Sequence, residues 1–395
     1  MNKRYTTNEF LFFLAWVLFS SSLILMATIF YVNNDNLEAV LRLVRYFAYV
    51  ICLIKILRTQ YMRTRIAFII LLVILFVLSG VGTGNLTYPL YCLIVLASFG
   101  ISGDKIISVT ARLQLFFLVS IIGLSQLGII KDYVFDPQIR ARHGLGFSWV
   151  TTAPILFFYF VLCYVYTNRT NLSTGKLLAL ELVNMWLFYM TDSKMAFMMS
   201  TAFILFIAYE NKNKHRWKWL SKFKKIYIAF PFLMLALTLF VVRVYDWYKP
   251  SWALIDRIMS YRLGLAQNAY QLYGIHLLGQ PINWVGYDYK ATLLGTSAAY
   301  NYVDNSYLQI TFNNGALFLV GVLFIYSFAI YKSIKNNDYY LVMIYIAILV
   351  IALTEPRLMN FAYNPFPLLA MSEMSMSFAN ERVVKIKKRI MAKAA

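Results

Sequence analysis

The sequence is poor in the charged residues that soluble domains carry on their surfaces. Only 14% of its 395 residues are charged, whereas 61% are apolar and the mean hydropathy is +0.62. A soluble globular domain has about 25% charged and about 45–50% apolar residues. Prolines number only nine, while phenylalanines and tyrosines number 31 and 30, which excludes a disordered chain and collagen-like repeats. The composition predicts a polytopic membrane protein.

Cysteine is also scarce, and familiar cofactor motifs are absent. The three cysteines, Cys52, Cys92 and Cys163, lie inside apolar runs without metal-ligand spacing, so we interpret them as buried thiols and exclude a disulfide scaffold. The sequence contains no P-loop, no Rossmann glycine set, no Ser-His-Asp arrangement and no cluster of metal ligands. We therefore expect no cofactor and no metal site.

Long apolar runs divide the chain into twelve candidate transmembrane helices. A bilayer core needs about 20 apolar residues per helix. The runs fall near 9–32, 37–57, 65–83, 86–101, 105–130, 150–167, 176–191, 195–209, 226–246, 305–331, 339–354 and 362–379. The fourth and the last are short and interrupted by polar residues, so the count lies between ten and thirteen. The first run is too long for a cleavable signal peptide. We expect an all-α integral membrane domain over residues 1–395.

Basic residues predict how this domain is oriented. With a cytoplasmic N-terminus, the inside segments hold 24 Lys and Arg, the outside segments hold nine, and four lie within spans. Cytoplasmic loops carry such an excess, so we expect both termini in the cytoplasm. The net charge of +20 is concentrated in 212–225 and 382–393, where it favours contact with anionic lipid over nucleic acid. One long outside loop, 247–304, begins with an apolar stripe that predicts amphipathic helices lying against the membrane.

The outside cations need another explanation, because orientation alone disfavours them. They gather in polar or glycine-containing segments and include Arg140, Arg142, Lys194, Arg257, Arg262 and Arg357. Arginine binds phosphate oxygens through two parallel hydrogen bonds, so a pyrophosphate ligand on this face would suit them. The alternative is that individual arginines reach to lipid headgroups.

Two titratable residues stand beside these cations. Glu355 lies between Thr354 and Pro356-Arg357 at the end of a span, where it could accept a proton from an attacking hydroxyl or pair with Arg357. His143 follows Arg142 and is a candidate general base or a donor of a positioning hydrogen bond. The sequence leaves both alternatives open.

Four separated segments resemble the Wzy-type bacterial polysaccharide polymerases, which are grouped with the O-antigen ligases. They are Arg142-His143-Gly144-Leu145-Gly146-Phe147; Thr191-Asp192-Ser193-Lys194, with Lys in place of Arg; Ser260-Tyr261-Arg262, with Tyr in place of Gly; and Asp304-Asn305-Ser306-Tyr307-Leu308 followed by Gly315. Glu355 with Asn360, Asn364 and Pro365 is similar to the closing segment of that family. Together these segments cover most of the chain in order.

The resemblance implies a GT-C-like, metal-independent glycosyltransferase in the bacterial cytoplasmic membrane, with its active site facing outside. Its substrates would be oligosaccharides on undecaprenyl pyrophosphate, which it would join into capsule, exopolysaccharide or O-antigen, beside a flippase and a chain-length regulator. The implied catalytic residues are Arg142, Arg262, Glu355, Asp304 and His143. The implied substrate-binding residues are Arg140, Lys194, Arg257, Asn305, Tyr307 and Arg357.

The sequence leaves two alternative functions open. O-antigen ligases have a histidine followed by Asn, Ser or Gln, and then a glycine after nine further residues. In this sequence Asn305 and Gly315 have the same spacing, but Asp304 stands in the position of the histidine. The exchange favours a polymerase. A flippase or transporter of lipid-linked oligosaccharides would also fit twelve spans, but it would carry charges midway along its helices. Here such cations are few and lie mostly near helix ends.

Overall fold

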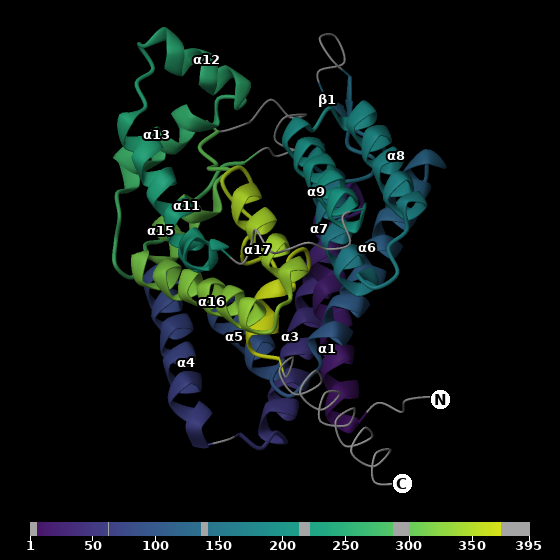
Figure 1. Cartoon of the computed structure of the whole chain (residues 1–395), viewed down its shortest axis with the longest axis vertical. Coiled ribbons are helices and arrows are strands. Elements are labelled where there is room, and N and C mark those ends of the chain that lie inside the picture. Colours follow the sequence, from purple (N-terminus) through teal and green to yellow (C-terminus); the bar gives the residue numbers. More distant parts are fainter. Residues whose placement is uncertain (1–5, 62, 136–140, 213–221, 287–299, 373–395) are drawn as a thin grey trace.

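The computed structural model describes residues 6–61, 63–135, 141–212, 222–286 and 300–372 (Figure 1). Helix accounts for 72% of the structure. The first helices are α1 (Thr7–Leu25), α2 (Ile29–Val32), α3 (Asp35–Leu57), α4 (Arg63–Thr83), α5 (Thr87–Ala97) and α6 (Gly103–Gln126). A short antiparallel pair follows, β1 (Val134–Phe135) and β2 (Arg142–His143), with Val134 opposite His143 and Phe135 opposite Arg142.

The remaining helices form the second half of the chain. They are α7 (Thr152–Asn168), α8 (Thr174–Thr191), α9 (Lys194–Lys212), α11 (Lys224–Val244), α12 (Pro250–Ile258), α13 (Arg262–Tyr273), α15 (Ser306–Asn314), α16 (Ala316–Lys335), α17 (Tyr339–Ile351) and the 3-10 helix η1 (Phe366–Ala370). In Figure 1, β1, α12 and α13 lie at the same, upper end of the molecule.

Local sequence explains where several helices begin. Thr6 and Glu9 form a capping box at the start of α1, each side chain bonding to the other's backbone N–H. Pro250 lies in the first turn of α12, where its missing N–H costs no helical hydrogen bond. Asp338 caps α17 by accepting a hydrogen bond from the backbone N–H of Leu341.

The apolar helices make the chain a helical membrane protein. Within the described residues, five helices are long and apolar enough to cross a bilayer: Thr7–Leu25, Ile66–Thr83, Gly103–Gln126, Lys224–Val244 and Ala316–Lys335. Three apolar helices, α5, α7 and α17, are shorter. Large apolar side chains face outward on several of these helices; Leu71 and Val81 of α4, for example, are 62% and 70% exposed. Such surfaces suit hydrocarbon and not water.

Two predicted spans have a different form in the structure. The run 305–331 is two helices, α15 and α16, because Gly315 between them has φ +93°, which a helix cannot accommodate. The run 362–379 forms no long helix over its described part, 362–372, where the chain makes turns and η1. Prolines at 365 and 367 explain the break, since proline removes a backbone donor and restricts the residue before it.

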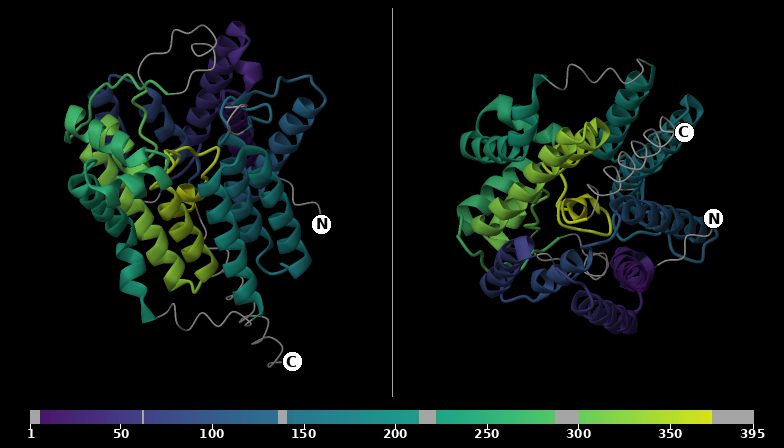
Figure 2. Two further views of the ribbon diagram at one scale, coloured as in Figure 1. Left: turned by 90° about the horizontal axis from the view of Figure 1, so that it is seen from above. Right: turned by 60° about the horizontal axis from the view of Figure 1, so that its bottom comes forward.

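This irregular segment, 352–372, lies in the middle of the surrounding helices, as the right-hand view of Figure 2 shows in yellow. Irregular backbone at membrane depth needs protein partners for its polar groups. Gln114 of α6 supplies two of them, donating from Nε2 to the carbonyls of Ala362 and Tyr363 at 3.0 and 2.8 Å. The Tyr345 hydroxyl of α17 donates to the Phe366 carbonyl at 3.1 Å. The segment is therefore part of the core.

Helix α7 packs at the centre of the main core. Every residue of α7 is buried except Tyr164, Thr167 and Asn168. Cys163 on α7, like Cys52 and Cys92, is a free and buried thiol, which confirms the interpretation from the sequence. A second, smaller core joins α11, α13 and α15 through Val242, Ala266, Ala269, Val303, Leu308 and Phe312. This smaller core holds α13, which begins with Arg262, beside Val303, which directly precedes Asp304.

Candidate functional site

Four charged side chains from three parts of the chain meet in one ion cluster: Arg262, Asp304, Glu355 and Arg357. Arg262 begins α13, Asp304 precedes α15, and Glu355 and Arg357 follow α17. Arg262 Nε lies 3.2 Å from Asp304 Oδ2, and its Nη2 lies 3.8 Å from Glu355 Oε1. Arg357 Nη1 lies 2.5 Å from Glu355 Oε2. The pairing of Glu355 with Arg357 that the sequence suggested is present, and Arg262 and Asp304 extend it.

The backbone around Glu355 is bound to the start of α15. Asn305 caps α15 by accepting from the Leu308 N–H at 3.0 Å, and its Nδ2 donates to the Leu353 carbonyl at 3.0 Å. The Ser306 hydroxyl donates to the Glu355 carbonyl at 2.5 Å and accepts from the Leu358 N–H at 3.1 Å. Both side chains are thus used to hold the ion cluster's backbone in place.

Arg262 is positioned by a strained turn between α12 and α13. Ser260 and Tyr261 have φ of 58° and 61°, a conformation that costs energy in residues other than glycine. Asp256, which is fully buried, compensates by accepting hydrogen bonds from the Leu263 N–H at 2.8 Å and the Tyr245 hydroxyl at 2.7 Å. The Arg262 guanidinium then donates from Nη1 to the Thr354 carbonyl at 2.7 Å, which aims it at the end of α17.

Burial governs the electrostatics of the ion cluster. The Glu355 side chain is only 4% exposed, whereas those of Arg262, Asp304 and Arg357 are 18–23% exposed. Burial raises the pKa of Glu355, and the neighbouring Arg357 and Arg262 oppose that rise. Burial likewise raises the pKa of Asp304 against the effect of the same two arginines. Carboxylates with a raised pKa are better suited to accept a proton near neutral pH than ordinary ones.

Arg142 and His143 belong to a second group, the β1–β2 hairpin. Arg142 Nε donates to the Thr191 carbonyl at the end of α8 at 3.0 Å. His143 Nδ1 lies 2.6 Å from Asp132 Oδ2, and Asp132 Oδ1 accepts from the Leu145 N–H at 2.7 Å. His143 therefore makes a positioning hydrogen bond, one of the two roles that the sequence left open. Whether Arg142 and Arg262 converge on one ligand stays a prediction.

The other predicted site residues differ in their surroundings. Lys194 and Arg257 are exposed, and so remain available to a ligand on the surface. Tyr307 is fully buried, and its hydroxyl donates to the Leu349 carbonyl at 2.8 Å. We therefore correct its assignment from substrate binding to the packing of α15 against α17. Arg140 lies outside the described residues.

Two acidic residues with clear structural roles were missed by the sequence motifs. Asp132 fixes His143, and Asp256 fixes the turn before Arg262. In the sequence, Asp132 and Asp256 could be recognised only as acidic residues of outside segments. No motif or sequence spacing linked Asp132 to His143, or Asp256 to the turn before Arg262. Among the described residues, no group of three His, Cys, Asp or Glu side chains gathers as ligands for a metal ion would.

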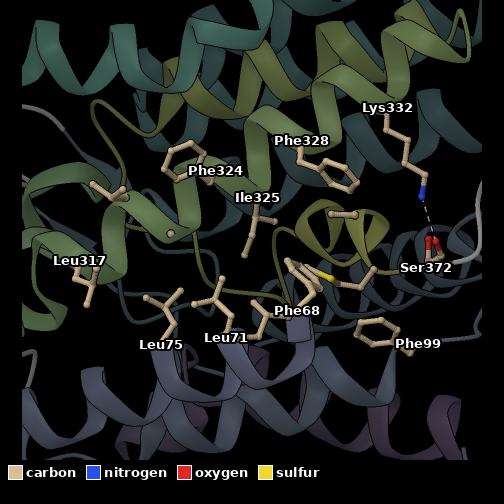
Figure 3. A pocket seen from close by; sticks show the side chains of 15 residues that line it. Phe68, Leu71, Leu75, Phe99, Leu317, Phe324, Ile325, Phe328, Lys332 and Ser372 are labelled. Atoms are coloured by element: carbon tan, nitrogen blue, oxygen red, sulfur yellow. Dashed lines mark hydrogen bonds between the residues drawn. The ribbon is translucent and has the colours of Figure 1, made fainter. Parts of the chain in front are cut away.

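An apolar groove runs between α4 and α16 (Figure 3). Its volume is about 750 Å³, and Leu71, Leu75, Phe324 and Phe328 are among its lining residues. At one end the Lys332 ammonium donates to the Ser372 carbonyl at 3.4 Å. Apart from that end, the groove offers hydrocarbon contacts of the kind that membrane lipid chains make.

Comparison with protein-family models, with curated proteins and with solved structures found no match for this chain.

Proposed function

We propose that this protein is a Wzy-type polysaccharide polymerase, a GT-C-like glycosyltransferase of about twelve spans in the bacterial cytoplasmic membrane. It joins oligosaccharide repeat units carried on undecaprenyl pyrophosphate. The growing glycan is the donor and a single lipid-linked unit is the acceptor. Both termini lie in the cytoplasm and the site faces outside, an orientation that the asymmetry of Lys and Arg supports.

One observation carries the proposal: three of the segments that resemble the family meet in the ion cluster. Arg262 comes from the Ser-Tyr-Arg segment, Asp304 from the Asp-Asn-Ser-Tyr-Leu segment, and Glu355 from the closing segment. These residues are far apart in the sequence. Apolar packing alone would not place four charged side chains together in a mostly buried part of a membrane protein. Such charges are costly in these surroundings and are kept chiefly for function.

The ion cluster contains the groups that the reaction needs. A hydroxyl of the acceptor attacks the anomeric carbon of the donor, and its proton passes to a carboxylate, Glu355 or Asp304. The bond between that carbon and the pyrophosphate oxygen breaks, and undecaprenyl pyrophosphate leaves with the bonding electrons. Arg262 and Arg357 offer N–H donors to the leaving oxygen, whose negative charge grows as the bond breaks. The same two arginines pair with Asp304 and Glu355.

The test is polymerisation by the purified protein in lipid nanodiscs. The substrate is the lipid-linked repeat unit isolated from source cells that lack this gene, because such cells accumulate the unpolymerised unit. We expect a ladder of products on a gel, with release of undecaprenyl pyrophosphate in step with it. If the unit is instead moved across the bilayer of sealed vesicles without growing in length, the protein is a transporter and the proposal is wrong.

A further inference from the structure

A second, polar cavity of about 500 Å³ lies where the end of α4, the large loop and the end of α15 meet. Its lining is Thr83, Asn85, Tyr88, Gln280, Pro281, Ile282, Asn283, Trp284, Asn313 and Asn314. None of these residues carries a formal charge. The cavity combines amide groups with two aromatic rings, in contrast to the arginines and carboxylates of the ion cluster.

Close backbone contacts build the wall of this polar cavity. Gly279, with φ +86°, lies so near the Asn313 carbonyl that a Cβ atom would come within 2.0 Å of its oxygen. The Gln280 N–H donates to that same carbonyl at 3.1 Å, and the Trp284 indole N–H donates to Asn313 Oδ1 at 2.9 Å. The loop and the end of α15 are therefore fixed to each other, and the polar cavity is a formed feature of the fold.

One buried side-chain amide of the polar cavity has an oxygen that accepts no hydrogen bond from the described residues. Asn314 is only 1% exposed; its Nδ2 donates to Ser79 Oγ at 2.8 Å, but its Oδ1 has no hydrogen-bond partner in the described part of the chain. A buried acceptor without a partner costs free energy, and a ligand that donates a hydrogen bond removes that cost. Asn283, whose side chain is exposed, lines the same cavity.

Aromatic rings lead from this cavity toward the ion cluster. The Trp284 ring contacts the Tyr302 ring edge to face, with centroids 6.1 Å apart. Tyr302 lies within electrostatic range of Asp304, Glu355 and Arg357. The polar cavity and the ion cluster also lie at opposite ends of α15, whose nine residues span about 13 Å at the α-helical rise. A chain of a few sugars would reach from one to the other.

We infer that the polar cavity is a binding subsite for uncharged sugar residues of the glycan whose reacting end lies in the ion cluster; this inference rests on the proposed function. Hydroxyl groups both donate and accept, so they match the amides of asparagine and glutamine. The C–H faces of sugar rings match aromatic rings, here those of Tyr88 and Trp284. The described residues that line the cavity offer amides and rings and carry no charge, so they match the hydroxyls of sugars and not phosphate.

The test measures glycan binding without catalysis. The probe is the oligosaccharide released from the lipid-linked repeat unit by mild acid, titrated calorimetrically into the whole protein in nanodiscs. We expect saturable binding that inorganic pyrophosphate does not displace. Asn283→Ala, which removes an exposed amide with no described hydrogen bond, should weaken binding about fivefold. Trp284→Ala should weaken it about tenfold or more, and Trp284→Phe less, because it keeps a ring.

Asn268→Ala is the matched control, since Asn268 is an exposed asparagine of α13 that does not line this cavity. It should bind the oligosaccharide as the wild type does. Equal binding by Asn283→Ala, Trp284→Ala and the wild type overturns the subsite, as does displacement by pyrophosphate. Polymerisation without oligosaccharide binding would leave the proposed function intact and refute the subsite alone. Binding that depends on Asn283 and Trp284 in a protein that does not polymerise supports the subsite and refutes the proposed function.

Discussion

The ion cluster and the β1–β2 hairpin both carry an arginine beside a titratable group, yet they are built in different ways. In the ion cluster, Arg262 binds two carboxylates and a carbonyl from other parts of the chain, and its partner Glu355 is nearly inaccessible. In the hairpin, the side chain of His143 is 31% exposed and pairs with Asp132, which lies close by in sequence. Arg142 also binds a distant segment, through the Thr191 carbonyl, so the difference between the two sites is one of burial: the ion cluster encloses a carboxylate between two arginines, whereas the hairpin leaves its histidine accessible.

The largest expected effect is that of Glu355→Gln. It removes the buried carboxylate and leaves Arg357 without its closest ionic partner, so we expect a loss of roughly a thousandfold in the rate of polymerisation. In the wild type, a base with a raised pKa becomes protonated as the pH falls through that pKa, so the rate should begin to fall at a higher pH than it would for an ordinary carboxylate. The measurement is the initial rate of ladder growth against pH. Glu355→Asp, which keeps the charge, should retain more activity.

Arg262→Ala should lower the rate on the order of a hundredfold or more. Loss of one strong electrostatic donor costs about 2–4 kcal/mol of transition-state stabilisation. Arg262→Lys keeps the positive charge but loses the planar set of N–H donors of the guanidinium, so it should restore only part of the rate. Lys249→Ala is the control, because Lys249 is an exposed cation of the same loop outside every motif, and it should be near neutral. If Arg262→Ala polymerises at the wild-type rate, the ion cluster does not take part in the reaction.

Arg142→Ala tests whether the hairpin takes part in binding the pyrophosphate. We expect a loss on the order of a hundredfold, with normal expression, because this arginine also matches a family motif. If Arg142 and Arg262 bind one pyrophosphate, the double variant should lose less than the product of the two single losses. Independent losses, or no loss for Arg142→Ala, would show that the hairpin arginine serves to anchor the end of α8 through Thr191.

His143→Gln should have a smaller effect, below about tenfold. A glutamine amide can still donate to Asp132, which preserves the positioning hydrogen bond, and the base we propose lies in the ion cluster. The same rate assay measures it. A loss as large as that of Glu355→Gln would move the general base to the hairpin.

Treatment with EDTA should have the smallest effect, leaving polymerisation largely intact, because in the mechanism that we propose arginines take the place of a metal ion in stabilising the leaving group. The ladder assay is run with and without the chelator. Activity lost on chelation and restored by magnesium or manganese would replace the arginine mechanism with one in which carboxylates hold a metal ion.

The helical, membrane-embedded character of the protein was predictable from the sequence, because a bilayer requires long apolar runs and these can be recognised from sequence alone. The count of twelve spans stays a prediction. The helices of the large loop were also predictable from an amphipathic pattern, and the structure has α12 and α13 there. The break at Gly315 was not, since glycine is common within membrane helices and only its φ of +93° shows that the helix ends. The irregular segment 352–372 was only partly foreseen: its apolar run from 362 was short and interrupted by polar residues, but the sequence did not show that its backbone would bond to Gln114 and Tyr345.

The sequence by itself determined that this protein is helical and lies in a membrane, and it identified charged residues worth examining. Tertiary structure decided which of them meet. Arg262 reaches Glu355 because a buried Asp256 holds a strained turn, and Asp304 joins them because Ser306 ties the start of α15 to the end of α17. Which helices bury apolar side chains depends on composition and on the periodicity of apolar residues, and both can be read from a sequence. An ion cluster depends on contacts between distant segments, and only the packing of the folded chain creates those contacts.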